Sequence, residues 1–163
     1  MGGRPDAALE TIEAALAIAR ETGVSLNLVG VMESFRAQAL LARGDVGAAR
    51  DLVERLVAVR EPNPLSWTIL LVAHAQVLIA ADAIGEQARI EASLNEAADI
   101  AERIDNPGLQ AQVCTERVHL VRAVGDETGW ERELREALRI YTQMDATGWM
   151  ERIEQELASP SAP

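Results

Sequence analysis

The stretch that decides the fold runs from Ile90 to Ala101 and reads IEASLNEAADIA. A large aliphatic residue, Leu94, lies four positions after Ile90, and Ala97 follows three positions later. Spacings of three and four place these side chains on one face of an α-helix. The stretch therefore predicts an amphipathic helix that packs through this face.

The same spacing occurs four times along the chain. The copies are Ala8-Ile12-Ala15, Ala48-Leu52-Arg55, Ile90-Leu94-Ala97 and Trp130-Leu134-Ala137, with arginine in place of alanine in the second copy. Their first residues are 40, 42 and 40 positions apart. A fixed period of this size is typical of stacked helical hairpins, in which each hairpin buries its apolar face against the next.

Cap and turn residues divide the chain into eight predicted helices. Asn63 and Asn106 each precede a proline, the usual order of an N-cap and a first helical residue. Gly44 and Gly125, each followed by an aspartate that can cap the next helix, predict tight turns between antiparallel helices. The four predicted N-caps of hairpins are Ser25, Asn63, Asn106 and Thr147. The predicted helices are Pro5–Glu21, Ser25–Arg43, Val46–Arg60, Pro64–Asp82, Glu86–Ile104, Pro107–Val124, Thr128–Met144 and Gly148–Leu157.

The second helix of each hairpin continues with further small and aliphatic residues. These continuations are Ala15-Leu16-x-Ile18-Ala19, Arg55-Leu56-x-Ala58-Val59, Ala97-Ala98-x-Ile100-Ala101 and Ala137-Leu138-x-Ile140-Tyr141. With the Gly-Asp turns, they resemble the tetratricopeptide repeat (TPR) family over essentially the whole chain. The match is good in the second helices and weak in the first ones. The period near 41 exceeds the family's 34 and is similar to the longer repeats of bacterial signalling ATPases, cyclase-linked regulators and transcription activators.

This resemblance implies an all-α fold: a superhelical stack of antiparallel helix hairpins, that is, a TPR-like α-solenoid of about eight helices. The repeat domain is predicted to span residues 1–158, and the Pro/Ser-rich residues 159–163 are predicted to form a disordered tail. The pattern starts and ends in mid-repeat, which is expected of a fragment. Trp149, Ile153 and Leu157 share one face of the last helix and are predicted to cover that end of the stack. The first helix has no such cover, so more repeats, another domain or a second copy of the chain is expected there.

Charge and composition exclude several classes of partner. The formal charge is −11, and all fifteen positive residues are arginine. So acidic a chain is a poor match for nucleic acid or for an anionic membrane surface, both of which attract clustered positive charge. The apolar stretch from Ile69 to Ala81 is too short to span a bilayer. With the single cysteine, Cys114, these features predict a cytoplasmic protein.

The sequence predicts no enzyme, no metal site and no cofactor. His74 and His119 are 45 positions apart, and neither has a second histidine or cysteine at helical ligand spacing. The glycines lie at scattered turns rather than in a phosphate-binding loop, and no nucleophile motif is present. The histidines are predicted to lie in the core or a groove, and Cys114 to be a small buried hydrophobe.

A binding groove is predicted on the first helices, which line the concave surface in the family that the chain resembles. Aligning these helices on Ala37, Ala75 and Val118 places three polar residues at equivalent positions. The predicted groove residues are Gln38, Gln76 and His119, with Ser34, Thr115 and Arg122 beside them. They could hydrogen-bond an extended peptide or a partner helix. Alternatively, they face solvent or a neighbouring helix.

The tryptophans also admit two interpretations. Trp130 is predicted to pack in the core, and Trp67 to pack under a loop, with an exposed binding anchor as the alternative. The function that fits these patterns best is a protein-binding module of a larger bacterial regulatory protein, with a protein or peptide partner. The alternatives are a self-association module that forms a homodimer and a small-molecule sensor, which would need an enclosed apolar pocket with convergent polar groups.

Overall fold

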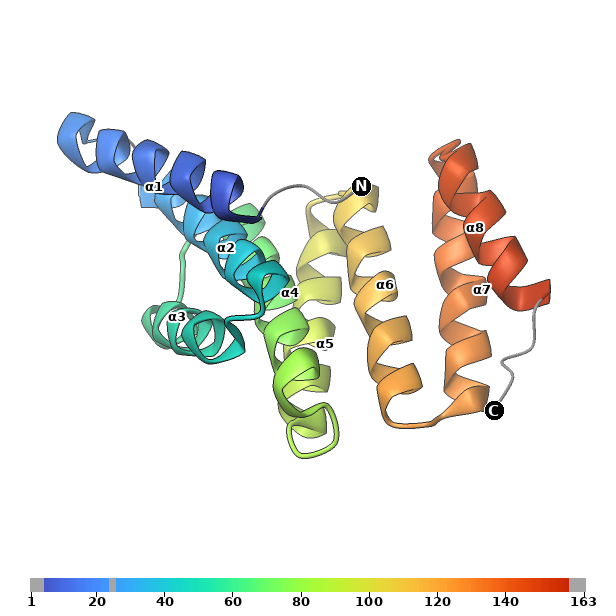
Figure 1. The fold of residues 1–163 in the computed structure, drawn as a ribbon. Coiled ribbons are helices and arrows are strands. Elements are labelled where there is room, and N and C mark those ends of the chain that lie inside the picture. Colours follow the sequence, from blue (N-terminus) through green and yellow to red (C-terminus); the bar gives the residue numbers. More distant parts are fainter. Residues whose placement is uncertain (1–4, 24–25, 159–163) are drawn as a thin grey trace.

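The computed structural model describes residues 5–23 and 26–158, and within these ranges every regular element is a helix (Figure 1). The helices are α1 (Pro5–Thr22), α2 (Leu26–Arg43), α3 (Val46–Val59), α4 (Pro64–Asp82), α5 (Gln87–Arg103), α6 (Pro107–Ala123), α7 (Glu127–Gln143) and α8 (Thr147–Ala158). All eight predicted helices are confirmed, with bounds that differ by at most one residue. The predicted tail and the predicted Ser25 cap lie outside the described residues.

Three aspartate or asparagine caps begin helices as their chemistry favours. The side-chain oxygens of Asn63 and Asn106 accept hydrogen bonds from the third residue of α4 and α6, each at 3.0 Å. Asp126 does the same for α7, accepting from the amide of Gly129 at 2.9 Å. Each bond satisfies a backbone N–H that the first helical turn leaves without a partner. The cap predictions at the two Asn-Pro pairs and at Asp126 are therefore confirmed.

Two cap predictions are wrong. Asp45 makes no capping bond, because its carboxylate accepts from Nε of Arg43 at 2.6 Å. Thr147 is the first helical residue of α8 rather than the residue before it, and the carbonyl of Ala146 accepts the first helical bond. The Gly44 turn itself is confirmed, since its φ of +93° is the left-handed conformation that glycine adopts without strain.

Consecutive helices pack against each other, and the even-numbered helices also form a row. In this row α2 contacts α4 and α4 contacts α6, whereas the backbones of the odd-numbered helices do not pack closely against one another in the part of the chain described. Figure 1 shows the helices following one another across the molecule in chain order, from α1 to α8. The arrangement is a stack of antiparallel hairpins, with the even-numbered helices as one layer and the odd-numbered helices as the other.

The apolar core is divided along this stack into three clusters instead of one centre. One cluster joins α1, α2 and α3 with Val77 of α4. The second joins α4, α5 and α6, and the third joins α6, α7 and α8. Because α4 and α6 each contribute to two clusters, every hairpin is stabilised by its neighbours, as expected of a repeat stack.

Helix α4 lies at the centre of the stack. It has the length and hydropathy of a membrane span, with a mean hydropathy of 1.6, but 61% of that window is buried within the protein. The helix contacts α2, α3, α5 and α6. A helix enclosed on several sides is apolar all round without any membrane, so its position in the stack accounts for its composition.

Equivalent positions of α5 and α7 occupy equivalent environments. From residue 91 to 100 and from residue 131 to 140, the order of buried, half-buried and exposed side chains is the same at every position. Each helix is also followed, two residues after its last residue, by an aspartate with positive φ, Asp105 after α5 and Asp145 after α7. The period of 40 residues between these two copies is therefore a property of the structure.

The first two copies of the predicted spacing begin on an exposed residue, and the second copy is predicted one position too early. Ala8, Ala48 and Arg55 are exposed, and α3 is anchored instead by Ala49 and Val53. In α3 the buried residues are Ala49, Leu52 and Val53, with Leu56 half-buried, and in α1 the buried face begins at Leu9. The shift removes the anomaly of an arginine at a core position.

Candidate binding groove

A groove of about 680 Å³ follows the row of even-numbered helices. Helices α2, α4 and α6 form its floor, and α7 and α8 contribute one side chain each at its far end. Its lining residues are Gln38, Leu41, Ala42, Gln76, Ile79, Ala80, Gln112, Thr115, Glu116, His119, Tyr141 and Trp149. The groove therefore spans three successive hairpins and combines apolar walls with a row of polar groups.

A chain of hydrogen bonds crosses the groove floor. Nε2 of Gln38 donates to Oε1 of Gln76 at 2.9 Å, and Nε2 of Gln76 donates to Oε1 of Glu116 at 2.8 Å. The other carboxylate oxygen of Glu116 lies 3.1 Å from Nδ1 of His119. We call these four residues the polar ladder. It links α2, α4 and α6 at steps of one repeat, because residues 38, 76 and 116 lie on neighbouring helices at the same level.

The ladder ends in a charged pair. Glu116 is only 6% exposed, so its carboxylate requires partners that replace the water it has lost. The hydrogen bond that His119 donates to Glu116 raises the pKa of His119, and this effect outweighs the burial that lowers it. Protonation of His119 therefore strengthens the pair and places a positive charge at the groove wall.

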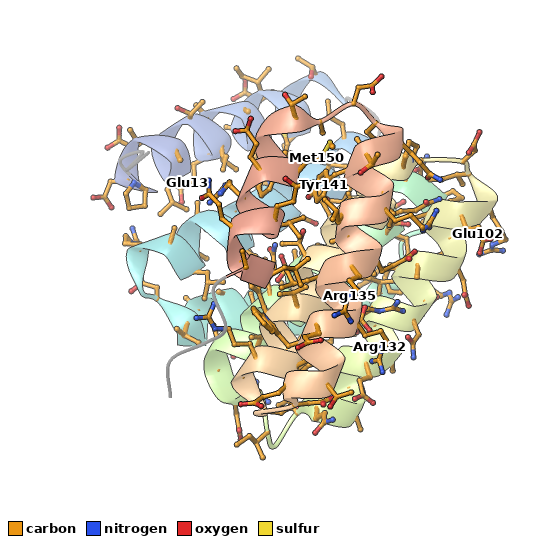
Figure 2. All side chains as sticks on the ribbon, turned by 90° about the vertical axis from the view of Figure 1, so that its right-hand side faces the viewer. Glu13, Glu102, Arg132, Arg135, Tyr141 and Met150 are labelled. Carbon is orange, nitrogen blue, oxygen red and sulfur yellow. The ribbon has the colours of Figure 1, made fainter. Side chains whose placement is uncertain are left out.

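An aromatic pair forms the far end of the groove. The rings of Tyr141 and Trp149 are stacked, with centroids 5.4 Å apart and an angle of 7° between their planes. The Tyr141 hydroxyl lies 3.3 Å from Oγ1 of Thr115, which connects α7 to α6. Trp149 remains 47% exposed, and Figure 2 shows Tyr141 near Met150, where α7 and α8 meet. The end of the groove thus presents an aromatic surface held in place by its neighbours.

The structure brings together four of the six predicted groove residues. Gln38, Gln76, Thr115 and His119 all line the groove. Arg122 lies instead in an adjoining pocket between α6, α7 and α8. The assignment of Ser34 is a correction: its side chain is fully buried and donates to the carbonyl of Gly30 at 2.9 Å, so it faces the helix rather than the groove.

Sequence reasoning missed two important residues of the groove. Glu116 joins the ladder, although the alignment of the first helices selects His119 in its place. Trp149 is predicted to cover the end of the stack together with Ile153. Ile153 is buried at that end, whereas Trp149 lines the groove. Glu116 lies three residues before His119, one helical turn away, and this spacing is the one signal in the sequence that could have identified it.

His74 lies in the core behind a surface network of charges. Its Nδ1 is 2.9 Å from Oγ of Ser93, whereas its Nε2 is 3.8 Å from Glu54, too far for a hydrogen bond. Burial lowers the pKa of His74 more than Glu54 raises it. Glu54 in turn accepts from Arg89 at 2.7 Å, so the network connects α3 and α5 across the outer layer. His74 therefore lies in the core, one of the two positions predicted for the histidines.

The remaining predicted side chains take the positions expected of core residues. Trp67 is 5% exposed and its indole N–H donates to Glu96 at 2.9 Å. Trp130 is half-buried against the cluster of α6, α7 and α8. Cys114 is buried, and burial raises the pKa of its thiol to about 11. A thiol with so high a pKa is a poor nucleophile at neutral pH.

No protein-family model matches the sequence, and a search of curated proteins finds no match. Within residues 5–23 and 26–158, no group of three or more histidine, cysteine or carboxylate side chains is placed to hold a metal ion. The geometry of the groove is therefore the main guide to function.

Proposed function

We propose that this chain is a protein-binding repeat module of the tetratricopeptide type, whose groove holds an extended segment of a partner protein. The long period resembles that of repeats in bacterial regulators, and we assign the module to a regulatory protein of that kind. The observation that supports binding is the polar ladder, which aligns hydrogen-bonding groups from three successive hairpins along one groove.

The ladder leaves hydrogen-bonding capacity for a partner. A glutamine amide has two N–H donors and two acceptor lone pairs. Gln76 uses one donor and one acceptor within the ladder, and Gln38 uses one donor. The remaining donor and acceptor of each amide can pair with the backbone of an extended segment, which presents one N–H and one C=O per residue.

The size of the groove sets the length of the segment. Neighbouring packed helices lie about 8–10 Å apart, so the distance from α2 to α6 is about 20 Å. An extended chain rises about 3.3 Å per residue. The groove therefore accommodates about six residues of an extended segment across its floor.

Selection of a random peptide library on the full chain tests the proposal. Ala80 is exposed and lines the groove, so Ala80→Arg places a long side chain in the groove without touching the ladder. Ala88 is equally exposed on α5, outside the groove, so Ala88→Arg is the matched control with the same change of charge. We expect selected peptides to lose at least about tenfold in affinity for Ala80→Arg and to bind Ala88→Arg unchanged.

Two results would contradict the proposal. Either no peptide is enriched over a blank surface, or the enriched peptides bind both variants equally well. Fluorescence anisotropy with labelled copies of the selected peptides measures both affinities directly. Far-UV circular dichroism of the two variants confirms that each retains its helices.

Self-association is a second candidate, favoured by exposed apolar side chains on the first two helices. Ile18 of α1 is 60% exposed, and Phe35 of α2 is 48% exposed. Large exposed apolar residues are typical of interaction surfaces when they lie together. Light scattering of the wild-type chain and of Ile18→Gln tests this candidate, which requires a dimer in the first case and a monomer in the second.

A further inference from the structure

A second pocket lies beyond the aromatic pair, between α6, α7 and α8. Its volume is about 140 Å³. Val118, Leu134, Ala137 and Ile153 form its apolar wall, and its polar side chains come mainly from α6 and α8. Helices α6 and α8 do not contact each other directly, although both pack on α7. The pocket is therefore the space that separates these two helices.

Two arginines at the pocket have no carboxylate partner. Arg122 on α6 and Arg152 on α8 form no ion pair within the described part of the chain, whereas most other arginines there bind a glutamate or aspartate. In a chain with a net charge of −11, carboxylates are abundant. The pocket therefore carries two unpaired positive charges in a protein whose net charge is negative.

Arg152 is oriented as a donor. Its guanidinium lies over the ring of Trp149, with the central carbon 4.9 Å from the ring centroid. Stacking on an aromatic face engages the flat side of a guanidinium and leaves its in-plane N–H groups available. Trp149 is itself fixed by Tyr141 on the neighbouring helix. The contact with Trp149 therefore restricts the guanidinium of Arg152 beside the pocket and leaves N–H groups available for a ligand.

The pocket also contains a group that can add to an anion site. Nδ1 of His119 faces Glu116, so its Nε2 lies on the other side of the ring and can donate a hydrogen bond when the imidazole is protonated. One carboxylate, Glu156, opposes the arginines from α8. It forms no ion pair with them, so it lowers the affinity for an anion without occupying the site.

We propose that this pocket binds a short organic acid whose carboxylates pair with Arg122 and Arg152 and so bridge α6 and α8. Guanidinium groups bind carboxylates through two parallel hydrogen bonds, which gives both strength and orientation. A volume of 140 Å³ holds about five water molecules at ~30 Å³ each, so the ligand has roughly five to eight non-hydrogen atoms. This site adjoins the peptide groove and shares part of its wall, but the proposal does not depend on the proposed function of the groove.

NMR titration with succinate tests the proposal, and succinamide, the uncharged diamide of the same shape, is the control ligand. The chain has three tryptophans. We expect the indole N–H signal of Trp149, assigned with Trp149→Phe, to shift with succinate and to stay fixed with succinamide. The signals of Trp67 and Trp130, which do not line the pocket, report any non-specific effect.

Three variants connect the signal to the pocket. Arg122→Met and Arg152→Met keep the apolar stem of each exposed side chain and remove its charge, and each should weaken succinate binding at least about tenfold. Glu156→Gln removes the opposing charge and should strengthen binding about threefold or more. Arg135→Met is the control, because Arg135 pairs with Glu131 and lies away from the pocket on α7 (Figure 2).

The proposal is overturned if succinate does not shift the Trp149 signal, or if succinamide shifts it equally. Equal shifts of all three tryptophan signals would also overturn it, as would unchanged affinity in both arginine variants. Weaker binding to Glu156→Gln would show that this glutamate is part of the site and would contradict the charge argument. Because the glutamate variant predicts a gain, its result does not depend on how well the arginine variants fold.

Discussion

Replacing Gln76 with leucine tests whether the polar ladder stabilises the fold. The substitution keeps the approximate volume but removes the bond from Gln38 and the bond to Glu116. A neutral hydrogen bond contributes about 0.5–1.5 kcal/mol and one to a charged group about 1.5–3 kcal/mol. Water in the open groove can hydrate Gln38, and the buried Glu116 keeps its bond with His119, so we expect a loss of about 1–2 kcal/mol in the free energy of unfolding.

Urea unfolding followed by far-UV circular dichroism and by tryptophan fluorescence measures this loss. Agreement between the two probes is required, because repeat stacks do not always unfold in one step. Gln112→Leu is the matched control: Gln112 lines the same groove but is exposed, and its side chain makes no hydrogen bond among the described residues. We expect the control to change stability by less than about 0.5 kcal/mol.

A double-mutant cycle separates the contribution of the ladder from the general effect of a leucine in the groove. Combining Gln76→Leu with Glu116→Gln should give a coupling energy of at least about 0.5 kcal/mol, because the two side chains are bonded directly. Additive effects, or a Gln76→Leu protein as stable as the wild type, would refute the reasoning. In that case the ladder would be an accidental alignment of solvated amides.

Two further predictions concern packing and titration. Ala49→Leu should destabilise the chain by about 1–3 kcal/mol because it overfills a buried site. Ala48→Leu, at an exposed site, should change stability by less than about 0.5 kcal/mol in the same urea assay. Equal effects would contradict the corrected register of α3. NMR titration should place the pKa of His119 above 6.5 and that of His74 below it, and Glu116→Gln should lower the former. The stability contributed by His119 should be present below pH 6.5 and be lost as pH rises through its folded pKa. The stability contributed by His74 should be present above pH 6.5 and be lost as pH falls through its folded pKa. Two histidines with the same pKa would refute this assignment.

The helices and most caps could be predicted because their signals are local. An asparagine before a proline satisfies a backbone donor whatever surrounds it, and both such pairs, at Asn63 and Asn106, cap as expected. Asp45 does not cap α3 because its carboxylate accepts a hydrogen bond from Arg43 instead. Competition of this kind depends on the positions of side chains, which the pattern of residue types does not specify.

The register of α3 could not be predicted because apolar residues come in adjacent pairs there. Ala48 is followed by Ala49, and Leu52 by Val53, so two registers fit the sequence almost equally well. The packing of α3 against α2 and α4 places the second residue of each pair, Ala49 and Val53, at the centre of the buried face. The groove residues depend on the same tertiary information: Ser34 fits the pattern of a groove residue but lies in the interior.

The groove and the acid pocket share side chains, and this has a thermodynamic consequence. Thr115, His119, Tyr141 and Trp149 line both spaces. Arg152 contacts the ring of Trp149, which also forms the end wall of the groove. An acid bound by Arg152 would therefore change the contacts of a side chain that lines the groove. Linkage between two sites is reciprocal, so a change in peptide affinity caused by the acid equals the change in acid affinity caused by the peptide. The two proposals can therefore be joined by one measurement, the affinity of a selected peptide with and without succinate, and equal affinities would show that the shared wall does not transmit occupancy.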